Sequence, residues 1–500
     1  MAAQRPDSHP GDVVAGDRTG RRTALGERPG TRVSTALVVG GGPNGLAAAA
    51  LLAVEGVRVT LLEAADEIGG GTRSWEGIVP GLLHDHCSAI HPMAVGSPLF
   101  ARLGLATYGL EWRFPEVDCV HLLDGGTAAA LHTDVAVTAA GLGPDGGTWR
   151  RLFAGPSARY DALAEDILGP LVGLPRHPLL LGRFGLPALA PATVLGKLFR
   201  TEAARALWAG IAAHAFTPLT RPLSSAIGLG IITAGHRHGW AVAAGGSRSI
   251  GRALAAVLTG HGGRIETGVS VRTASDLPPA DVTLFDLDPA QVATILGDRL
   301  PPRVARGYRA FRRGPGAYKV DFAVAGGVPW TAEVARRAGT VHVGGTMAEV
   351  AAAERDVARG RLPRRPFVLV GQQYLADPAR SAGEVHPVWA YAHVPYGYDG
   401  DATEPLIAQI ERFAPGFRGR VLGMRVTRPA DFAAGNPNFA GGDILTGAKT
   451  SASWCWARDR PAIRTRSGLP ACISARLPLR RGRARTACAE PTRRGGRWPI

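Results

Sequence analysis

Cysteine is scarce in this chain, and its spacing excludes the usual uses of cysteine clusters. The sequence has five cysteines in 500 residues, and no two of them form a CxxC pair. A disulfide framework needs a higher density of cysteines, and a cysteine-based zinc site needs closely spaced pairs. We therefore expect neither disulfides nor a bound metal, and we expect a cytoplasmic protein.

Long uncharged segments are nearly absent as well. Only residues 33–54 lack charge over a length that could span a bilayer, and GGGPNG at their centre predicts a strand, a turn and a helix instead. The pair Arg21 and Arg22 resembles a twin-arginine export signal, but the apolar run begins ten residues later and belongs to the predicted nucleotide fold. We therefore do not expect export. The sequence contains no internal repeat, no GK[ST] phosphate loop and no Ser-His-Asp order.

The positive charge is unevenly distributed. Of the net charge of +16, residues 451–500 carry twelve arginines against Asp459 and Glu490, and residues 1–35 carry six arginines against four acidic residues. Residues 36–450 are left with a net charge of +4, which is ordinary for a soluble enzyme. The charge therefore gives no support for nucleic-acid binding.

The most informative segment is LVVGGGPNGLAAAALLAVEGVRVTLLE, residues 37–63. Its order predicts a strand, a glycine turn, a helix and a second strand, which is the pattern of a dinucleotide-binding βαβ unit. Gly40 allows the tight turn, Gly42 admits the pyrophosphate, and Gly45 lets the helix pack closely on the sheet. Pro43 and Asn44 complete the turn, where the helix N-terminus favours phosphate.

Glu63 ends the second strand, eighteen residues after Gly45. A carboxylate at this point accepts hydrogen bonds from the ribose hydroxyls of the adenosine and repels a 2′-phosphate, so NADP is disfavoured.

A second glycine segment follows. Gly69, Gly70 and Gly71 come six to eight residues after Glu63 and precede Thr72. The segment EAADEIGGGTRS resembles the E-A-x-x-x-x-G-G-x-x-x-S/T pattern of FAD-dependent amine oxidases and phytoene desaturases. The resemblance implies that this segment returns the backbone to the phosphates of FAD.

Four further segments resemble phytoene desaturase-related flavoproteins: residues 80–100, 239–271, 314–324 and 436–444. The resemblance implies a FAD-dependent oxidoreductase that removes a hydride from a C–H bond of an apolar, isoprenoid-like substrate. It also implies that the strand RIETGVSV, ending at Val271, borders the adenine end of FAD through the backbone. A flavin amine oxidase is the alternative enzyme. No catalytic residue can be assigned.

The last fifty residues do not fit this pattern. After about Thr450 the apolar periodicity ends and the chain becomes arginine-rich. Reading new codons from the third base of each codon from Cys472 onward gives, with suitable synonymous choices, HLCSASTPPGAGAHGMCGANAARRALAD, which resembles the family's flavin-closing segment. We interpret residues 451–500 as an out-of-frame translation. A chain that keeps this frame could be a non-catalytic remnant without flavin.

Two groups of ionisable residues are weaker candidates for a site. His84, Asp85, His86 and His91 lie close together, but no second cluster completes a metal site, and the related flavoproteins carry a similar segment without a metal. We interpret this segment as a loop near the flavin, with His91 a candidate for the substrate pocket. Lys319 alternates with apolar neighbours, so it lies on a strand and lines the cavity or faces solvent.

Residues 166–199 are apolar but contain five prolines and several basic residues. Core packing in the substrate domain is the favoured interpretation, and contact with a membrane surface is the alternative.

Together these patterns predict an α/β fold with a discontinuous Rossmann-like FAD-binding domain and a mixed α+β substrate domain. We assign residues 33–130, 239–300 and 431–450 to the first domain and residues 131–238 and 301–430 to the second. Residues 1–32 form a disordered extension. The oligomeric state cannot be predicted.

Overall fold

The computed structural model describes residues 33–168, 174–448 and 471–474. The predicted extension and nearly all of the predicted out-of-frame segment lie outside these residues, as do residues 169–173.

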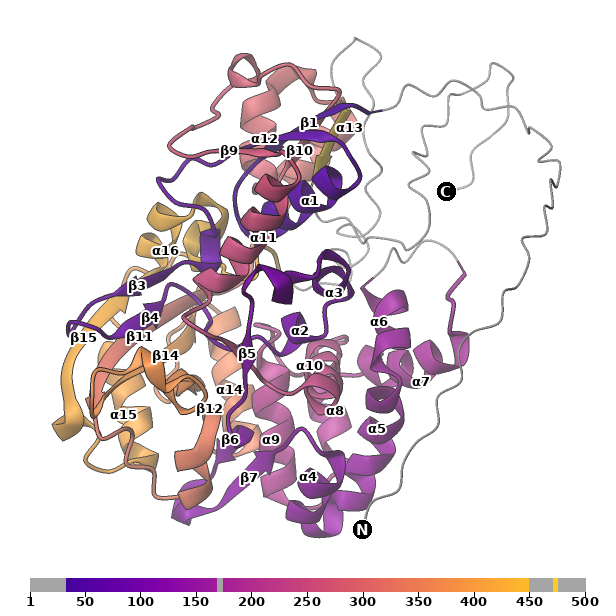
Figure 1. The fold of residues 1–500 in the computed structure, drawn as a ribbon. Coiled ribbons are helices and arrows are strands. Elements are labelled where there is room, and N and C mark those ends of the chain that lie inside the picture. Colours follow the sequence, from indigo (N-terminus) through magenta and orange to yellow (C-terminus); the bar gives the residue numbers. More distant parts are fainter. Residues whose placement is uncertain (1–32, 169–173, 449–470, 475–500) are drawn as a thin grey trace, which may run out of the picture. The chain divides into compact units, whose positions relative to one another are not determined.

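The strand predicted before Gly40 lies inside a five-stranded sheet with the order β16-β10-β1-β2-β9. Strands β1, β9 and β10 of this sheet are labelled at the top of Figure 1. Every neighbouring pair in the sheet is parallel. Its strands are β1 (Thr35–Val39), β2 (Arg58–Leu62), β9 (Arg264–Glu266), β10 (Val282–Phe285) and β16 (Ala471–Ser474). Parallel sheets are buried on both faces, which explains the continuous apolar runs ALVV and VTLF. The predicted α/β class with a Rossmann-like domain is confirmed.

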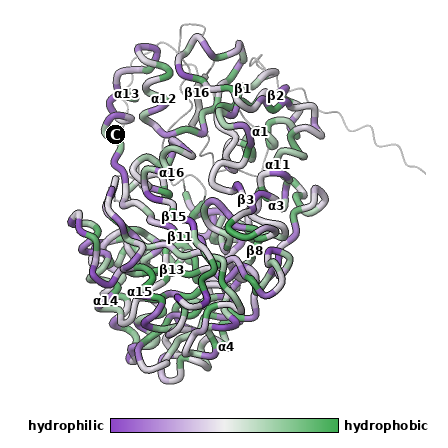
Figure 2. The backbone as a smooth tube through the Cα atoms, turned by 90° about the vertical axis from the view of Figure 1, so that its left-hand side faces the viewer, coloured by the Kyte–Doolittle hydropathy of each residue, from purple (hydrophilic) through white to green (hydrophobic). Residues whose placement is uncertain are grey.

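Helices cover both faces of this sheet. On one face, α1 (Pro43–Val54) packs against α11 (Arg248–Gly260). On the other, α12 (Pro289–Leu296) and α13 (Pro302–Arg309) share an apolar cluster with Leu37 and Val39 of β1. Hydrophilic and hydrophobic residues are interleaved along α13 (Figure 2), where Ala305 and Tyr308 face the cluster.

A seven-stranded sheet with the order β15-β11-β14-β13-β12-β6-β7 forms the second layer. It is antiparallel except between β12 and β6. Its strands are β6 (Val117–Leu122), β7 (Ala128–Leu131), β11 (Gly316–Ala325), β12 (Ala338–Val343), β13 (Val368–Gly371), β14 (Val385–Val394) and β15 (Val421–Thr427). Strands β6 and β7 lie at the end of residues 33–130, which we assigned to the FAD-binding domain from the sequence.

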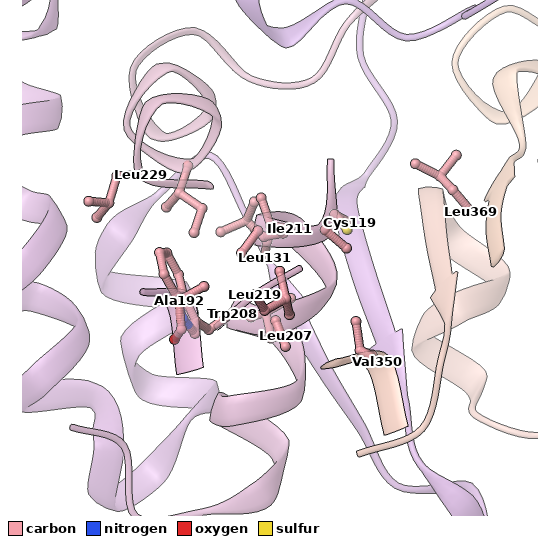
Figure 3. Packing of buried hydrophobic residues seen from close by; sticks show 14 of the residues in the cluster. Cys119, Leu131, Ala192, Leu207, Trp208, Ile211, Leu219, Leu229, Val350 and Leu369 are labelled. Atoms are coloured by element: carbon pink, nitrogen blue, oxygen red, sulfur yellow. The ribbon is translucent and has the colours of Figure 1, made fainter. Parts of the chain in front are cut away.

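Most of the remaining helices pack near the second sheet. They are α4 (Val135–Gly141), α5 (Gly146–Ala158), α6 (Tyr160–Ile167), α7 (Pro178–Leu189), α8 (Ala192–Gly196), α9 (Glu202–Ala213), α10 (Ser225–His238), α14 (Met347–Ala358), α15 (Thr403–Phe413) and α16 (Pro429–Gly435). Leu207, Trp208 and Ile211 of α9 meet Cys119 and Leu131 of the sheet in one apolar core (Figure 3).

Short elements link the layers. They are α2 (Pro92–Val95), α3 (Pro98–Leu103), β3 (Ser74–Glu76) paired with β4 (Leu83–Asp85), and β5 (Trp112–Arg113) paired with β8 (Val242–Ala243). The prediction that the segment from His84 to His91 is a loop is wrong at its start, because His84 and Asp85 lie in the paired strand β4. The predicted strand RIETGVSV is also shorter, ending at Glu266.

Candidate functional site

The first glycine turn connects β1 to α1. Gly40 has φ +106°, a left-handed conformation that favours glycine, and a Cβ there would lie 2.7 Å from the carbonyl oxygen of Asp286. A Cβ on Gly45 would lie 2.0 Å from the carbonyl oxygen of Gly40. Helix α1 has Gly42 as its N-cap, which makes no side-chain capping bond, and begins at Pro43. The turn is therefore a close contact of backbone with backbone at a helix N-terminus that favours an anion.

Two carboxylates lie at this turn. Glu63 accepts hydrogen bonds from the Gly41 amide at 2.6 Å and from the Ala65 amide at 2.9 Å. Asp286, at the carboxyl end of β10, accepts a hydrogen bond from the Gly45 amide at 2.9 Å. The structure thus places Glu63 where its sequence position predicts, at the end of β2 beside the glycine turn.

The second glycine segment folds back onto the first. The Gly69 amide donates a hydrogen bond of 2.7 Å to the carbonyl of Gly41. A Cβ on Gly70 would lie 3.1 Å from the Cα of Gly42, so the two segments are in van der Waals contact. The hydroxyl of Thr72 donates to the carbonyl of Gly69 at 2.8 Å, which closes the short turn Gly70–Thr72. Two segments separated by more than twenty residues form one glycine-lined surface.

A cavity of about 110 Å³ begins where this surface ends. It is lined by Gly70, Gly71, Arg73, Trp75, His86, Cys87, Asp321, Arg425, Thr427, Asp431, Phe432, Gly435, Asn436 and Phe439. Burial, with the nearby charge of Arg73, lowers the pKa of His86 to about 4. Burial raises the pKa of the Cys87 thiol to about 11. Both side chains are therefore neutral at pH 7.

A buried ionic network lies beside the cavity. The ammonium of Lys319 donates to the carbonyl of Asp85 at 2.9 Å and pairs with Asp321. Lys319 is 2% exposed, so the alternative that it faces solvent is wrong. Arg380 pairs with Asp85 and Asp377. Burial raises the pKa of Asp85, but the charge of Arg380 and hydrogen bonds to the carboxylate outweigh it and hold that pKa below its usual value.

The two faces of the seven-stranded sheet differ in chemistry. Side chains on one face are aliphatic or aromatic, among them Val320, Phe322, Val341, Val370 and Val388. Helix α15 packs on this first face, and α9 packs on the other. The second face carries most of the buried polar, ionisable and aromatic residues of the sheet: Cys119, His121, Lys319, Asp321, Thr340, His342, Trp389, Tyr391 and His393.

The histidines of this face form a cluster with α9. His214, just after α9, places its Nε2 atom 3.1 Å from Nε2 of His342. Burial lowers the pKa of His121 to about 4 and that of His214 to about 3. These imidazoles are neutral at pH 7. Within the described ranges, no three His, Cys, Asp or Glu side chains are arranged to hold a metal ion.

Two predicted residues lie away from the cavity lining. His91 is bonded through Nε2 to the Ser247 hydroxyl at 2.8 Å. Val271 is partly buried against the apolar cluster of the five-stranded sheet.

Sequence reasoning missed Asp286, Asp321, Arg425 and Phe439. Of these, Asp286 had a readable signal, because it directly follows the strand VTLF, and the carboxyl ends of parallel strands face the ligand crevice. The other three come from segments whose proximity depends on the second sheet.

The packing at Gly45 makes a testable prediction. We expect Gly45→Ala to lower the free energy of unfolding by about 2–3 kcal/mol, because α1 must move away from the turn. The same movement should abolish dinucleotide binding. Chemical denaturation and cofactor titration measure the two effects. Gly147→Ala is the matched control, since Gly147 is an exposed helical residue with no atom within 4 Å of an added Cβ. Equal stability of the Gly45→Ala variant and the wild type would contradict the prediction.

Comparisons with known proteins agree with this geometry. The family profile described as "NAD(P)-binding Rossmann-like domain" matches residues 38–103. An oxidoreductase from Methanosarcina mazei superposes with a TM-score of 0.53 at 17% identity, over 78% of this chain and 87% of that chain. A mutant of putrescine oxidase made to redesign its cofactor binding superposes with a TM-score of 0.52 at 18% identity, over 79% of this chain and 85% of that chain. A protein from Pyrococcus furiosus superposes with a TM-score of 0.51 at 16% identity, over 79% of this chain and 88% of that chain. No curated protein matches the sequence. The superpositions show a shared fold, and the profile match shows a Rossmann-like dinucleotide-binding domain in it.

Proposed function

We propose that the chain binds FAD and oxidises a C–H bond of an apolar, isoprenoid-like substrate to a double bond. The observation that carries the proposal is the contact between the two glycine segments, through the hydrogen bond from Gly69 to Gly41 and the close approach of Gly70 to Gly42. A single βαβ turn serves any dinucleotide. The second segment is the part that the sequence shares with FAD enzymes.

The residues present fit this cofactor. Gly40, Gly42 and Gly45 form a turn without Cβ atoms at the N-terminus of α1, where the amides and the helix dipole suit a pyrophosphate. Glu63 lies where it can exchange its bonds to the turn amides for bonds to ribose hydroxyls. Gly69 and Thr72 would hold the phosphates from the other side, and the backbone near Val271 would border the adenine. When bound, the flavin supplies a hydride acceptor.

The side chains of this chain would orient the substrate and exclude water. The cavity beside Gly70 and Gly71 is enclosed by Trp75, Phe432 and Phe439. His86 and Cys87 are neutral, so the charges of the lining come from Arg73, Asp321, Arg425 and Asp431. The apolar substrate class itself rests on the resemblance to phytoene desaturase-related flavoproteins.

One observation favours a flavin amine oxidase as the second candidate. Lys319 is buried on β11, and its ammonium lies 5.9 Å from the ring centroid of Trp389. The Trp389 and Tyr391 rings are stacked at 5.7 Å. A strand lysine with neighbouring aromatic rings is what an amine oxidase of this fold requires. If the protein oxidises primary amines and releases hydrogen peroxide, and does not oxidise isoprenoids, it is an amine oxidase.

The test of the proposal uses two forms of the chain. We would purify the given 500 residues and a second form in which residues after Thr450 are translated in the shifted frame. We expect the second form to be yellow and to release about one FAD per chain on denaturation. A colourless first form would mark it as the non-catalytic remnant. If neither form binds added FAD, the proposal is wrong. Substrate screening with isoprenoid hydrocarbons and with amines then separates the two enzymatic candidates.

A further inference from the structure

Helix α7 carries apolar residues on both its covered and its open side, with Arg183 as its one charged residue. Leu180, Phe184 and Ala188 are buried and face the core. On the opposite side Leu179, Leu186 and Leu189 are 89%, 73% and 57% exposed. The predicted core packing of this region therefore describes one side of the helix only.

The covered side is explained by neighbouring helices. Helix α7 packs against α10, α6 and α5, and the three helices α5, α6 and α7 are grouped in Figure 1. Nothing in the described part of the chain covers the other side, and Leu174, just before the helix, is 97% exposed. We call Leu174, Leu179, Leu186 and Leu189 the leucine face. Apolar side chains on opposite sides of a helix normally face core or lipid.

The chain around α7 carries charges of one sign, although Arg176 is paired with Glu165 of the neighbouring helix α6. Between residues 174 and 201 the chain has no acidic residue, whereas Arg176, Arg183, Lys197 and Arg200 are basic. Arg183 lies on α7 at the edge of the leucine face and is exposed. Leucines flanked by arginine and lysine are the composition of segments that bind anionic membrane surfaces.

The size of the leucine face argues against a second protein chain as the partner. Helix α7 has 12 residues and is therefore about 18 Å long, and the leucine face consists of four side chains. A stable protein interface takes about 20–30 residues from each partner. A bilayer surface has no such minimum, because every inserted leucine contributes separately.

We propose that the leucine face of α7 binds the surface of an anionic lipid bilayer, with the helix lying in the plane of the interface. Among the described residues no helix is both long enough and apolar enough to span a membrane. The contact is peripheral, held by leucine insertion and by attraction between the basic residues and lipid phosphates. The inference does not depend on the proposed reaction.

The test is co-sedimentation of the full chain with vesicles of phosphatidylcholine and phosphatidylglycerol. We expect the triple variant Leu179→Ser, Leu186→Ser, Leu189→Ser to bind at least tenfold more weakly than the wild type. Because both proteins carry the same arginine-rich C-terminal segment, their difference belongs to α7. Leu422→Ser is the matched control, since Leu422 is 59% exposed on β15, far from α7 in sequence, and should leave binding unchanged.

A second measurement reports insertion directly. In the Leu186→Trp variant, the fluorescence of the introduced tryptophan is obtained by subtracting the wild-type spectrum. We expect brominated lipids to quench this fluorescence. The proposal is overturned if the triple variant binds as the wild type does, or if Leu186→Trp is not quenched. It is also overturned if the wild type sediments equally without vesicles and the triple variant does not, because the leucine face would then join copies of this chain.

Discussion

Replacing Arg380 by methionine is expected to lower the free energy of unfolding by about 3–5 kcal/mol. Arg380 is fully buried, with ion pairs to Asp85 and Asp377 and a hydrogen bond of 2.7 Å to the carbonyl of Ala243. Methionine fills much of the same volume but leaves the buried carboxylate of Asp85 without a cation and that of Asp377 with Arg113 alone. The cost is therefore the desolvation of those carboxylates rather than the loss of packing.

The effect should extend to the nucleotide site. Asp85 accepts from the Ser247 amide at 2.7 Å, and Asp377 accepts from the Gly245 amide at 2.9 Å, so both acids hold the segment that leads into α11. Helix α11 in turn approaches the second glycine segment at Gly251, whose Cβ would lie 3.4 Å from the Cα of Gly69. We expect the Arg380→Met variant to bind flavin more weakly even where it is folded.

Urea denaturation with a matched surface variant checks this prediction. Arg418 pairs with Glu404 on the exposed side of α15, and Arg418→Met should cost about 0.5 kcal/mol. A loss as small as this in the Arg380→Met variant would show that Asp85 and Asp377 find other partners or become protonated.

Acidification between pH 6.5 and 4 is expected to unfold the protein. Burial lowers the pKa of His91, His121 and His236 from 6.5 to about 4 and that of His214 to about 3. The unfolded chain therefore binds protons in this window while the folded chain does not, and stability falls as the pH falls. Above pH 6.5 the stability is fully present. Each histidine removes roughly 3 kcal/mol by pH 4, so the four together remove on the order of 10 kcal/mol, comparable to the stability of a typical domain.

Asp118 acts in the opposite direction. Burial raises its pKa to about 6, so protonation of this carboxyl in the folded state offsets about one of the four histidines. The net slope stays destabilising on acidification.

His236 provides the internal control for this prediction. Its Nε2 atom accepts a hydrogen bond of 2.9 Å from the Trp149 indole, so the ring proton of the neutral form is on Nδ1, which donates to the carbonyl of Thr133 at 3.1 Å. Protonation would remove the acceptor. His236→Gln can keep one donor and one acceptor without titrating, and should reduce the stability loss between pH 7 and 5 by about 2 kcal/mol. An unchanged slope would mean that His236 is not neutral in the folded protein.

The parts of the fold that could be predicted are those whose cause is local. The glycine turn, α1 and β2 follow from residues adjacent in sequence, and in α11 the buried residues Ile250, Leu254 and Leu258 recur at helical spacing. The strand around Lys319 was predicted from alternation and is β11.

The parts that could not be predicted depend on distant partners. Arg380 and Asp85 are separated by 295 residues, and neither position has a local pattern that names the other. The histidine cluster joins His342 to His214 in the same way, across 128 residues. The predicted end of the strand RIETGVSV was wrong for a related reason. Only Arg264–Glu266 has a neighbouring strand, β2, to pair with.

The position of β1 between β2 and β10 has a consequence for synthesis of the chain. The Gly45 amide finds its carboxylate at Asp286, 241 residues later, and the same strand end supplies the second neighbour of β1. At about 5–20 residues per second, a ribosome needs roughly 12–50 seconds between the two. During that interval the apolar strand TALVV has one open edge, which any other extended chain can pair with. A nascent chain of this protein should therefore depend on chaperone holding until residue 286 has emerged, and a message truncated before that point should yield aggregate rather than a smaller nucleotide-binding domain.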